Sequence, residues 1–274
     1  MVANKLEVLG IDSPQACSSI PTGDGELQAF LSKLYADADS LIDTSPAFAS
    51  AEPSDTSLKC KAGWKIGKLY YANDENPTRT AKRPGQPLNW HLRSSCHTGP
   101  KQSYDDLRSG LFVQHTPNEK EYIEGLHNIE RLQVWQDDVV EAWLVQYEIP
   151  PPTTNRDFCI LPVRREITGQ EANSGLYSTD TTTVARRFQV ISIPVTHPKG
   201  APAQGYVRAR YASVEDVREL VPTSGDEPKK QVVWTMATMS DPAGLIPSWI
   251  SEKVLPSKIV EDVPSCVKWL KNRQ

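Results

Sequence analysis

The sequence predicts an α+β fold in which an antiparallel β-sheet packs against a long C-terminal helix. Three observations support this prediction. Short stretches of alternating apolar and polar residues, bounded by turns rich in proline and glycine, fill the second half of the chain. Their spacing suits a meander of antiparallel strands better than alternating βαβ units. The chain then ends in apolar residues at helical spacing, from Ile246 to Leu270.

The first half of the chain mixes helices and strands. Leu27, Leu31 and Leu34 recur at helical spacing, and a stretch rich in Ser, Ala, Pro and Asp follows them. A polar, proline-containing segment, Asn73–Pro87, separates two apolar runs that predict strands. The predicted elements are, in order, a helix over Gly25–Ile42, a loop over Asp43–Ser57, strands over Trp64–Tyr71 and Asn89–His97, and helices over Tyr104–Phe112 and Asn118–Ile129.

Five further strands and the terminal helix complete the prediction. The strands cover Val139–Ile149, Asp157–Glu166, Val184–Thr196, Gly205–Ala212 and Gln231–Ser240. The helix runs from about Leu245 to Leu270, with a kink or a division into two segments expected at Pro256 and Pro264. No repeat or long linker divides the chain. We therefore expect one domain over residues 1–274, with 1–57 as an N-terminal helix and loop extension and 58–274 as its core.

Composition and charge exclude several classes of protein. Of the 274 residues, 38% are hydrophobic and 23% are charged, which predicts a globular chain with a sizeable core. A net charge of -4 argues against nucleic acid as a partner. No apolar run approaches the ~18 residues of a membrane span, so no transmembrane segment is expected. Transient contact with a membrane stays compatible with the sequence.

The cysteines predict a reducing compartment. The five residues Cys17, Cys60, Cys96, Cys159 and Cys266 are odd in number, widely spaced and without a CxxC pair. The N-terminus has no basic region followed by an apolar run, so it does not resemble a secretory signal. We expect a cytoplasmic protein with five free thiols.

Strong catalytic and cofactor motifs are absent from the sequence. It has no GxSxG, no HExxH, no phosphate-binding loop and no complete dinucleotide loop, so no cofactor is expected. His91 and His97 share a face of one predicted strand, with Cys96 beside them, and a metal site is conceivable there. A polar strand face is the preferred interpretation, because no carboxylate or second cysteine has ligand spacing nearby. We therefore predict no metal site.

Arginine and aromatic residues on the predicted strands leave two interpretations open. Six arginines on the predicted strands fit a solvated outer sheet face, although one inward arginine could anchor the carboxylate or carbonyl of a ligand. They are Arg164, Arg165, Arg186, Arg187, Arg208 and Arg210. Alternating aromatic positions, such as Trp143 with Tyr147 and Trp234 with Met236, fit either an ordinary core or the wall of an apolar pocket.

Three blocks of sequence occur in order in the second half of the chain. They are Asn155-Arg156-Asp157-Phe158, Gly205-Tyr206-Val207-Arg208-Ala209, and Val233-Trp234-Thr235-Met236 followed by Asp241–Pro247. Together they resemble the START-like (StAR-related lipid-transfer, helix-grip) superfamily, over about residues 115–274. An earlier segment with Trp90, Arg93, Ser95 and His97 resembles a strand of an uncharacterised fungal START-like family. The resemblance implies a curved antiparallel sheet wrapped around the C-terminal helix, with an internal apolar cavity between them.

The resemblance also implies one departure. Some steroid-binding relatives carry a buried acid and an arginine in this pocket. The matching positions here hold Trp143 and Pro162. We therefore expect the pocket to lack a sterol-hydroxyl salt-bridge site and to be more apolar at that end.

These observations lead to one main functional prediction and two alternatives. The main prediction is a binding module for a hydrophobic small molecule, such as a lipid, a sterol or a polyketide- or terpenoid-like metabolite. The first alternative is a cofactor-independent cyclase or pericyclase of secondary-metabolite biosynthesis that uses the same cavity. The second is a protein-interaction scaffold with a filled core. A closed, apolar cavity would favour a carrier, and an open cavity with convergent polar groups would favour a cyclase.

Two sets of residues follow from these predictions. The wall of the cavity is expected to contain Trp143, Phe158, Ile160, Val207, Ala209, Trp234, Met236, Ile259 and Val263. The polar candidates for catalysis are His91, Arg93, His97, Tyr147, Arg187 and Tyr211.

Overall fold

A single curved antiparallel sheet dominates the computed structural model, which describes residues 9–11, 14–48, 62–71, 74–173, 175–223 and 230–273. The strands follow the order β2-β3-β4-β11-β10-β8-β7-β6-β5, with β1 added to β8 and β9 to β7. Their bounds are β1 Gln15–Ala16, β2 Lys65–Tyr70, β3 Thr78–Arg83, β4 Trp90–His97, β5 Leu126–Gln136, β6 Val140–Tyr147, β7 Asn155–Ile167, β8 Thr182–Thr196, β9 Tyr206–Arg208, β10 Arg210–Pro222 and β11 Gln231–Asp241.

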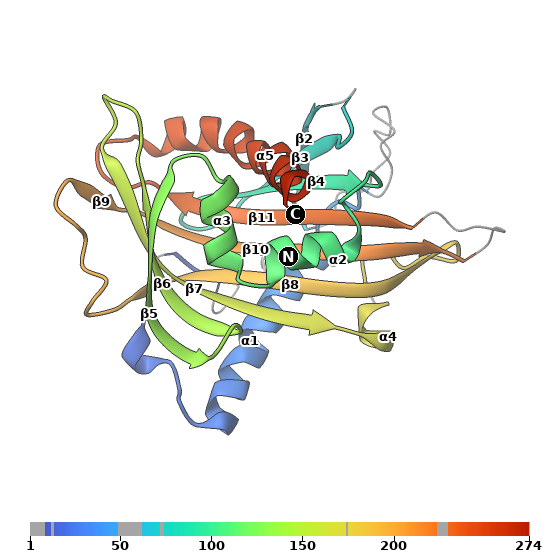
Figure 1. The fold of residues 1–274 in the computed structure, drawn as a ribbon, viewed down its shortest axis with the longest axis horizontal. Coiled ribbons are helices and arrows are strands. Elements are labelled where there is room, and N and C mark those ends of the chain that lie inside the picture. Colours follow the sequence, from blue (N-terminus) through green and yellow to red (C-terminus); the bar gives the residue numbers. More distant parts are fainter. Residues whose placement is uncertain are drawn as a thin grey trace.

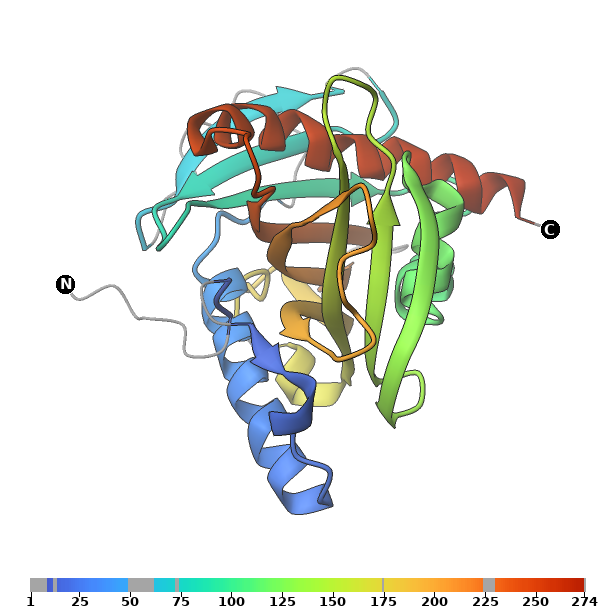
Figure 2. The same cartoon turned by 90° about the vertical axis from the view of Figure 1, so that its left-hand side faces the viewer.

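Helices cover both faces of this sheet. The long helix α5 (Ser248–Asn272) lies across the concave face, together with α2 (Tyr104–Leu107), a π-helical turn (Arg108–Phe112) and α3 (His115–Tyr122). Helix α1 (Asp24–Asp43) packs on the opposite face, and Figure 2 shows the two long helices on different sides of the strands. A short helix, α4 (Gly169–Ala172), follows β7. The predicted α+β architecture is therefore confirmed.

Two apolar cores result from this arrangement. The core under α1 contains Leu31, Leu34 and Leu41 together with strand residues such as Leu161 and Ile191. The core under α5 contains Leu107, Phe188, Trp234 and Val263 among its members. Because both faces of the central strands are covered, even the charged side chains on these strands are buried.

The charged side chains under α1 form a network of ion pairs. Asp216 binds Arg218 at 2.6 Å and Arg187 at 2.7 Å, and these two arginines also bind Asp43 and Asp39 of α1. Burial raises the pKa of Asp216, but the two arginines outweigh this effect and lower it to about 2. This network explains why β10 continues to Pro222 through residues whose charge predicts no strand.

Three further elements differ from the sequence prediction. The segment predicted as polar linker contains β3, whose Thr78 and Thr80 are buried between β2 and β4. The predicted helix over Asn118–Ile129 is instead the end of α3 followed by the start of β5. Three bulges interrupt the pairing of β5 with β6, so the apolar residues of β5 are not evenly alternating. Helix α5 continues through Pro256 and Pro264, so the division into two segments that was one of the two expectations there does not occur.

The described cysteines are buried free thiols. These are Cys17, Cys96, Cys159 and Cys266, whereas Cys60 lies outside the described residues. Within the described ranges, no helix combines the length and the apolar character that crossing a membrane requires.

Candidate ligand cavity

A cavity of about 1170 Å³ lies between the concave face of the sheet and the helices α3 and α5. Strands β6, β7, β8, β10 and β11 form its floor and sides. Its outer end lies between the β6–β7 turn, with the exposed Glu148, Pro150 and Pro151, and the segment that leads from β11 into α5. Arg156 joins these two rims, because its Nε donates a 2.6 Å hydrogen bond to the carbonyl of Pro242.

Three aromatic side chains form one wall of the cavity. Phe158 of β7 packs edge-on against Tyr147 of β6, with ring centroids 5.5 Å apart, and against Tyr211 of β10 at 5.3 Å. Burial raises the pKa of both tyrosine hydroxyls well above the usual value, so they remain neutral donors near neutral pH. Met236 and Ile259 line the cavity from β11 and α5. This wall offers apolar surface with two hydroxyl groups.

The inner end of the cavity is acidic. His115 and Glu119 project from α3, Glu215 from β10 and Asp262 from α5, and all four line the cavity. Burial, followed by repulsion from Glu215 and Asp262, raises the pKa of Glu119 well above its usual value. Burial likewise raises the pKa of Asp262 to about 7, although the charge of Arg93 opposes this shift. The cavity is therefore apolar along one wall and polar at its end.

The orientation of His115 is determined by the backbone before α3. Its Nδ1 lies 2.7 Å from the carbonyl oxygen of Leu111, in the π-helical turn. A carbonyl oxygen only accepts hydrogen bonds, so Nδ1 carries the hydrogen. Burial lowers the pKa of His115, which leaves its Nε2 as an unprotonated acceptor. This Nε2 lies 3.4 Å from a carboxylate oxygen of Glu119.

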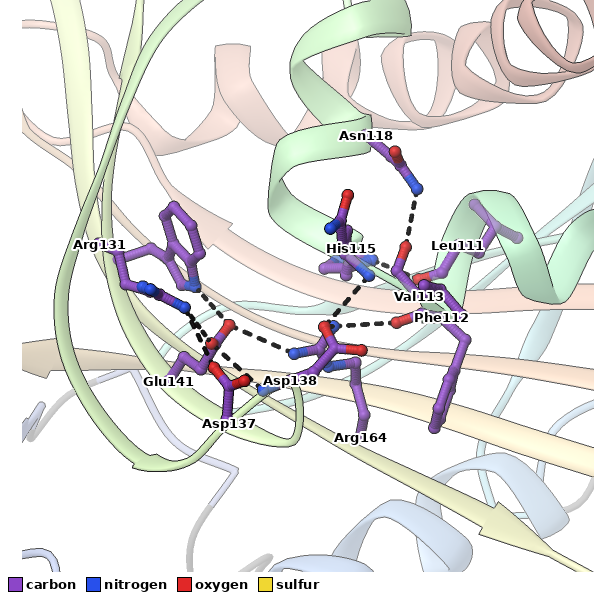
Figure 3. A network of polar contacts seen from close by, with 12 residues as sticks. Leu111, Phe112, Val113, His115, Asn118, Arg131, Asp137, Asp138, Glu141 and Arg164 are labelled. Carbon is purple, nitrogen blue, oxygen red and sulfur yellow. Dashed lines mark hydrogen bonds and ion pairs between the residues drawn. The ribbon is translucent and has the colours of Figure 1, made fainter. Parts of the chain in front are cut away.

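An ion-pair network lies behind the inner end of the cavity, and Figure 3 shows its residues. Arg164 of β7 binds Glu141 at 3.3 Å and Asp138 at 2.7 Å, and it donates to the carbonyl of Phe112 at 2.9 Å. Glu141 also binds Arg131 at 3.0 Å. These contacts attach the β5–β6 hairpin to the turn that precedes α3.

This network bears on the departure expected from steroid-binding relatives, in which Trp143 and Pro162 replace a buried acid and an arginine of the pocket. The structure has a buried acid–arginine pair two positions away on each of these two strands, at Glu141 and Arg164. Neither residue is among the described residues that line the cavity. Because this pair lies outside the cavity, it does not contradict that expectation.

The structure brings only part of the predicted wall to the cavity. Phe158, Met236 and Ile259 line it. Trp234 and Val263 are buried in the core under α5, and Ala209 is buried where its N–H donates to the carbonyl of Asp157. Val207 packs beside the turn at Gly244. Trp143, Ile160, Val207, Ala209, Trp234 and Val263 are therefore not among the described lining residues.

Trp143 lies on the same face of β6 as Tyr147 but is not among the described lining residues. Its ring packs with Leu126, Val145 and Ile160, and its Nε1 donates a 3.2 Å hydrogen bond to Glu141. The lining residue Phe158 packs against this cluster from the side of the cavity. The strand alternation is as predicted, but the indole is buried within this cluster and does not line the cavity.

The polar candidates are divided in the same way. Tyr147 and Tyr211 line the cavity. His97 is buried against Asn76, Gln102 and Ser95, and burial lowers its pKa to about 4. Arg187 lies on the opposite face of the sheet, where it binds Asp216, so it is placed away from the cavity.

His91 and Arg93 lie on the concave side but outside the cavity lining. His91 contacts Glu252 of α5 at 3.2 Å. Arg93 stacks on the indole of Trp234, with its guanidinium carbon 3.9 Å from the ring centroid. Its Nε and Nη1 have no hydrogen-bond partner among the described atoms. Arg93 is therefore a buried positive charge close to the acidic end of the cavity.

Sequence reasoning missed the acidic end itself. Glu215 lies beyond the predicted end of its strand, and Asp262 occurs in a helix that was analysed for its apolar face. His115 and Glu119 lie four positions apart, a spacing that places two side chains on one helical face. That spacing was the one local signal available, and it became meaningful only once α3 was located over the sheet.

Apolar side chains are exposed beside the outer end of the cavity. The exposed fractions are 100% for Leu245, 68% for Trp249, 44% for Val254 and 38% for Ile250. All four belong to α5 or to the segment just before it, and Ile250 and Val254 also line the cavity. We call these four residues the mouth patch.

Two solved human structures have the same fold. The chain is similar to human StAR-related lipid transfer protein 5, with 16% identity and a TM-score of 0.59 over 89% of this chain and 98% of that one. It is also similar to human STARD10, with 15% identity and a TM-score of 0.55 over 96% and 85% of the two chains. The fold is thus START-like, as the sequence resemblance predicted.

The chain also matches the sequence model of one protein family. Residues 90–270 match the family described as "Protein of unknown function (DUF3074)", and the chain belongs to this family. No curated protein matches the chain by sequence.

Proposed function

We propose that this protein binds a hydrophobic small molecule in the cavity between the sheet and α5. The observation that supports this proposal most is the cavity of about 1170 Å³ with the aromatic wall of Tyr147, Phe158 and Tyr211. Burying apolar ligand surface contributes about 25 cal/mol per Å² before the costs of association. The name of one similar human structure, StAR-related lipid transfer protein 5, refers to lipid transfer, which fits such a ligand.

The polar end gives the proposed ligand an orientation. A lipid, a sterol or a polyketide- or terpenoid-like metabolite has a long apolar body and few polar atoms. The apolar body would lie along Phe158 and Met236, and a hydroxyl or carbonyl group would reach the side chains near Glu119 and Asp262. Buried polar groups need hydrogen-bond partners, so this end selects a ligand with a polar group at one end.

The mouth patch supports ligand exchange at a membrane surface. Trp249 and Leu245 are exposed beside the opening, and a tryptophan is suited to the boundary between lipid and water. We infer that the mouth patch contacts membranes transiently while a hydrophobic ligand enters or leaves. The proposed protein is therefore a carrier or a sensor that remains outside the bilayer.

Native mass spectrometry of the protein purified from its own cells tests the binding proposal. A bound small molecule should appear as a mass shift of the folded protein that disappears on denaturation, and extraction should then yield an apolar compound. If the protein consistently carries no small molecule and also fails to bind lipid, sterol and apolar-dye probes, the cavity is not a ligand site and the proposal is wrong.

A cofactor-independent cyclase is the second candidate. The observation that favours it is the convergence of His115, Glu119 and Asp262 at the end of an open cavity. Neutral carboxylic acids in an apolar site can donate protons, and the cavity walls can hold a flexible chain in a folded conformation. A co-purified compound that the protein converts to a cyclised product, with loss of conversion but not of binding in Glu119→Gln, would establish this function.

A further inference from the structure

We propose that His115, Glu119 and Glu215 form a binding site for a divalent transition-metal ion at the inner end of the cavity. One ligand atom from each residue can be chosen so that all three atoms lie within 4.8 Å of one another. All three residues also line the cavity. The sequence offers only His91, His97 and Cys96 as conceivable metal ligands, and it predicts no metal site. The site proposed here joins two residues of one helix to a residue from a strand far away in the chain. The proposal goes beyond ligand binding and is testable with the metal ion alone.

The hydrogen bonding of His115 suits a metal ligand. Metal-binding histidines usually donate their second ring N–H to a carbonyl or carboxylate, which holds the ring in place. His115 meets this condition, since Nδ1 donates to the carbonyl of Leu111 at 2.7 Å and Nε2 faces Glu119. Leu111 belongs to a π-helical turn, a distortion that occurs often at functional sites.

The two carboxylates belong to different elements, α3 and β10, and each is positioned separately. Glu119 follows His115 by four positions, so α3 presents both side chains on one face. Glu215 is held from β10, because one of its oxygens, Oε2, accepts a 2.7 Å hydrogen bond from Nε1 of Trp234. Its other oxygen, Oε1, accepts no hydrogen bond from the residues that the structure describes. Glu215 therefore keeps one oxygen available for a metal ion.

The charges near the site balance when a divalent cation is bound. Two ionised carboxylates and one neutral imidazole neutralise a 2+ ion. Other charged groups near the site are Arg93, Asp262, Arg164 and Asp138. A bound metal ion would thus neutralise the two carboxylates in this buried position.

The residue types indicate which ions would bind. One imidazole with two carboxylates suits Zn²⁺, Fe²⁺ or Mn²⁺, whereas Ca²⁺ and Mg²⁺ prefer oxygen ligands alone. Three protein ligands leave a further coordination position, as in metal sites that bind substrates. Because the three residues line the cavity, that position would face the cavity and would be available to an oxygen atom of a bound ligand.

Metal titration of the intact protein tests this proposal. Protein stripped with a chelator and free of tags should bind one equivalent of Zn²⁺ in calorimetry, and Co²⁺ should give the visible absorption of a low-symmetry site. His115→Ala should weaken Zn²⁺ binding by about 100-fold or more, since even the loss of supporting groups around metal ligands costs 10–100-fold. Glu119→Gln should weaken it as well and tests the site independently if His115→Ala does not fold.

Two matched variants serve as controls. His127→Ala removes an exposed histidine outside the cavity, and Glu121→Gln changes an exposed carboxylate on the same helix as Glu119. Both should bind Zn²⁺ like the unchanged protein. Zn²⁺ should also raise the melting temperature of the unchanged protein and the controls, but not that of His115→Ala. The proposal would be overturned if the unchanged protein shows no saturable Zn²⁺ binding. It would also be overturned if His115→Ala and Glu119→Gln both bind Zn²⁺ as tightly as the unchanged protein.

Discussion

Nε1 of Trp234 donates a 2.7 Å hydrogen bond to Glu215 on the neighbouring strand, and the guanidinium of Arg93 stacks on the same indole. The indole therefore holds a carboxylate at the acidic end of the cavity while its own ring stays in the core. Trp234, which the sequence predicts on the cavity wall, thus acts on the site from within the core.

Trp234→Phe tests this relationship with little change in apolar surface. The variant keeps an aromatic ring beneath Arg93 but loses the hydrogen bond to Glu215. Because hydrogen bonds to charged groups contribute about 1.5–3 kcal/mol, the free energy of unfolding should fall by about that amount in denaturant titrations. Trp64→Phe is a suitable control, because Trp64 is as deeply buried as Trp234 and its Nε1 has no partner among the described atoms. Equal losses in the two variants would mean that ring size, and not the hydrogen bond, accounts for the effect.

Trp143→Ala tests whether the buried indole of Trp143 contributes to ligand binding. Trp143 is packed among Leu126, Val145 and Ile160, so its loss should lower the free energy of unfolding by about 3–5 kcal/mol. The affinity of an apolar fluorescent dye, expressed per folded molecule, should change little. A small stability loss with a large loss of dye affinity would instead place the indole on the cavity wall.

Glu252 makes the attachment of α5 sensitive to acid. Its carboxylate binds Lys82 at 2.7 Å and Nδ2 of Asn89 at 2.6 Å, and it contacts His91. Burial raises the pKa of Glu252, but the hydrogen bonds from Lys82 and Asn89 outweigh it and lower the pKa to about 2. The folded pKa thus lies below the unfolded value of about 4.3, so the ionised form stabilises the fold.

The resulting stability should be complete above the unfolded pKa and lost as the pH falls through about 4.3 toward about 2. The Glu252→Gln variant has no ionisable carboxylate at this position. The difference in the free energy of unfolding between the two proteins should therefore shrink over this pH range and stay constant above it. Asp216 titrates in both proteins and cancels in the comparison. A difference that does not depend on pH would show that the ionisation of Glu252 contributes nothing.

The mouth patch makes a separate prediction about membranes. Trp249→Ala should reduce binding to phospholipid vesicles by about tenfold, because inserting a large aromatic side chain contributes about 1.5 kcal/mol or more. Its stability should change little, since Trp249 is 68% exposed. Val134→Ala removes apolar surface from an exposed position on β5 and serves as the control. Equal vesicle binding by all three proteins would exclude the patch as a contact surface.

Much of the sheet could be predicted because its strands carry a strong apolar signal. β8 and β11 contain long runs of buried residues such as Val190, Ile191 and Trp234, bounded by turns. β10 was underestimated beyond Ala212, because its later residues are charged. Their partners lie on α1 and β8, and ion pairs across such distances leave no local pattern in the sequence.

The site was harder to predict than the fold for the same reason. Alternation along β6 and β7 assigned faces correctly, so Tyr147 and Phe158 could be placed inward. Alternation does not tell which inward side chains line a cavity and which are buried in a packed cluster, as Trp143 is. The acidic end requires α3, β10 and α5 to meet, and only the three-dimensional arrangement joins Glu119, Glu215 and Asp262.

The central claim is that the cavity between the sheet and α5 accepts a hydrophobic ligand, and filling that cavity tests it most directly. Ser213 lines the cavity on β10, whereas Ser32 is exposed on α1 across the sheet. The measurement is the equilibrium titration of an environment-sensitive apolar dye into the unchanged protein, Ser213→Phe and Ser32→Phe, with folding verified by circular dichroism. Ser213→Phe should bind the dye about tenfold more weakly, since the added ring occupies the space that the ligand needs. Ser32→Phe should bind it like the unchanged protein. Undiminished, saturable dye binding by folded Ser213→Phe would contradict the account.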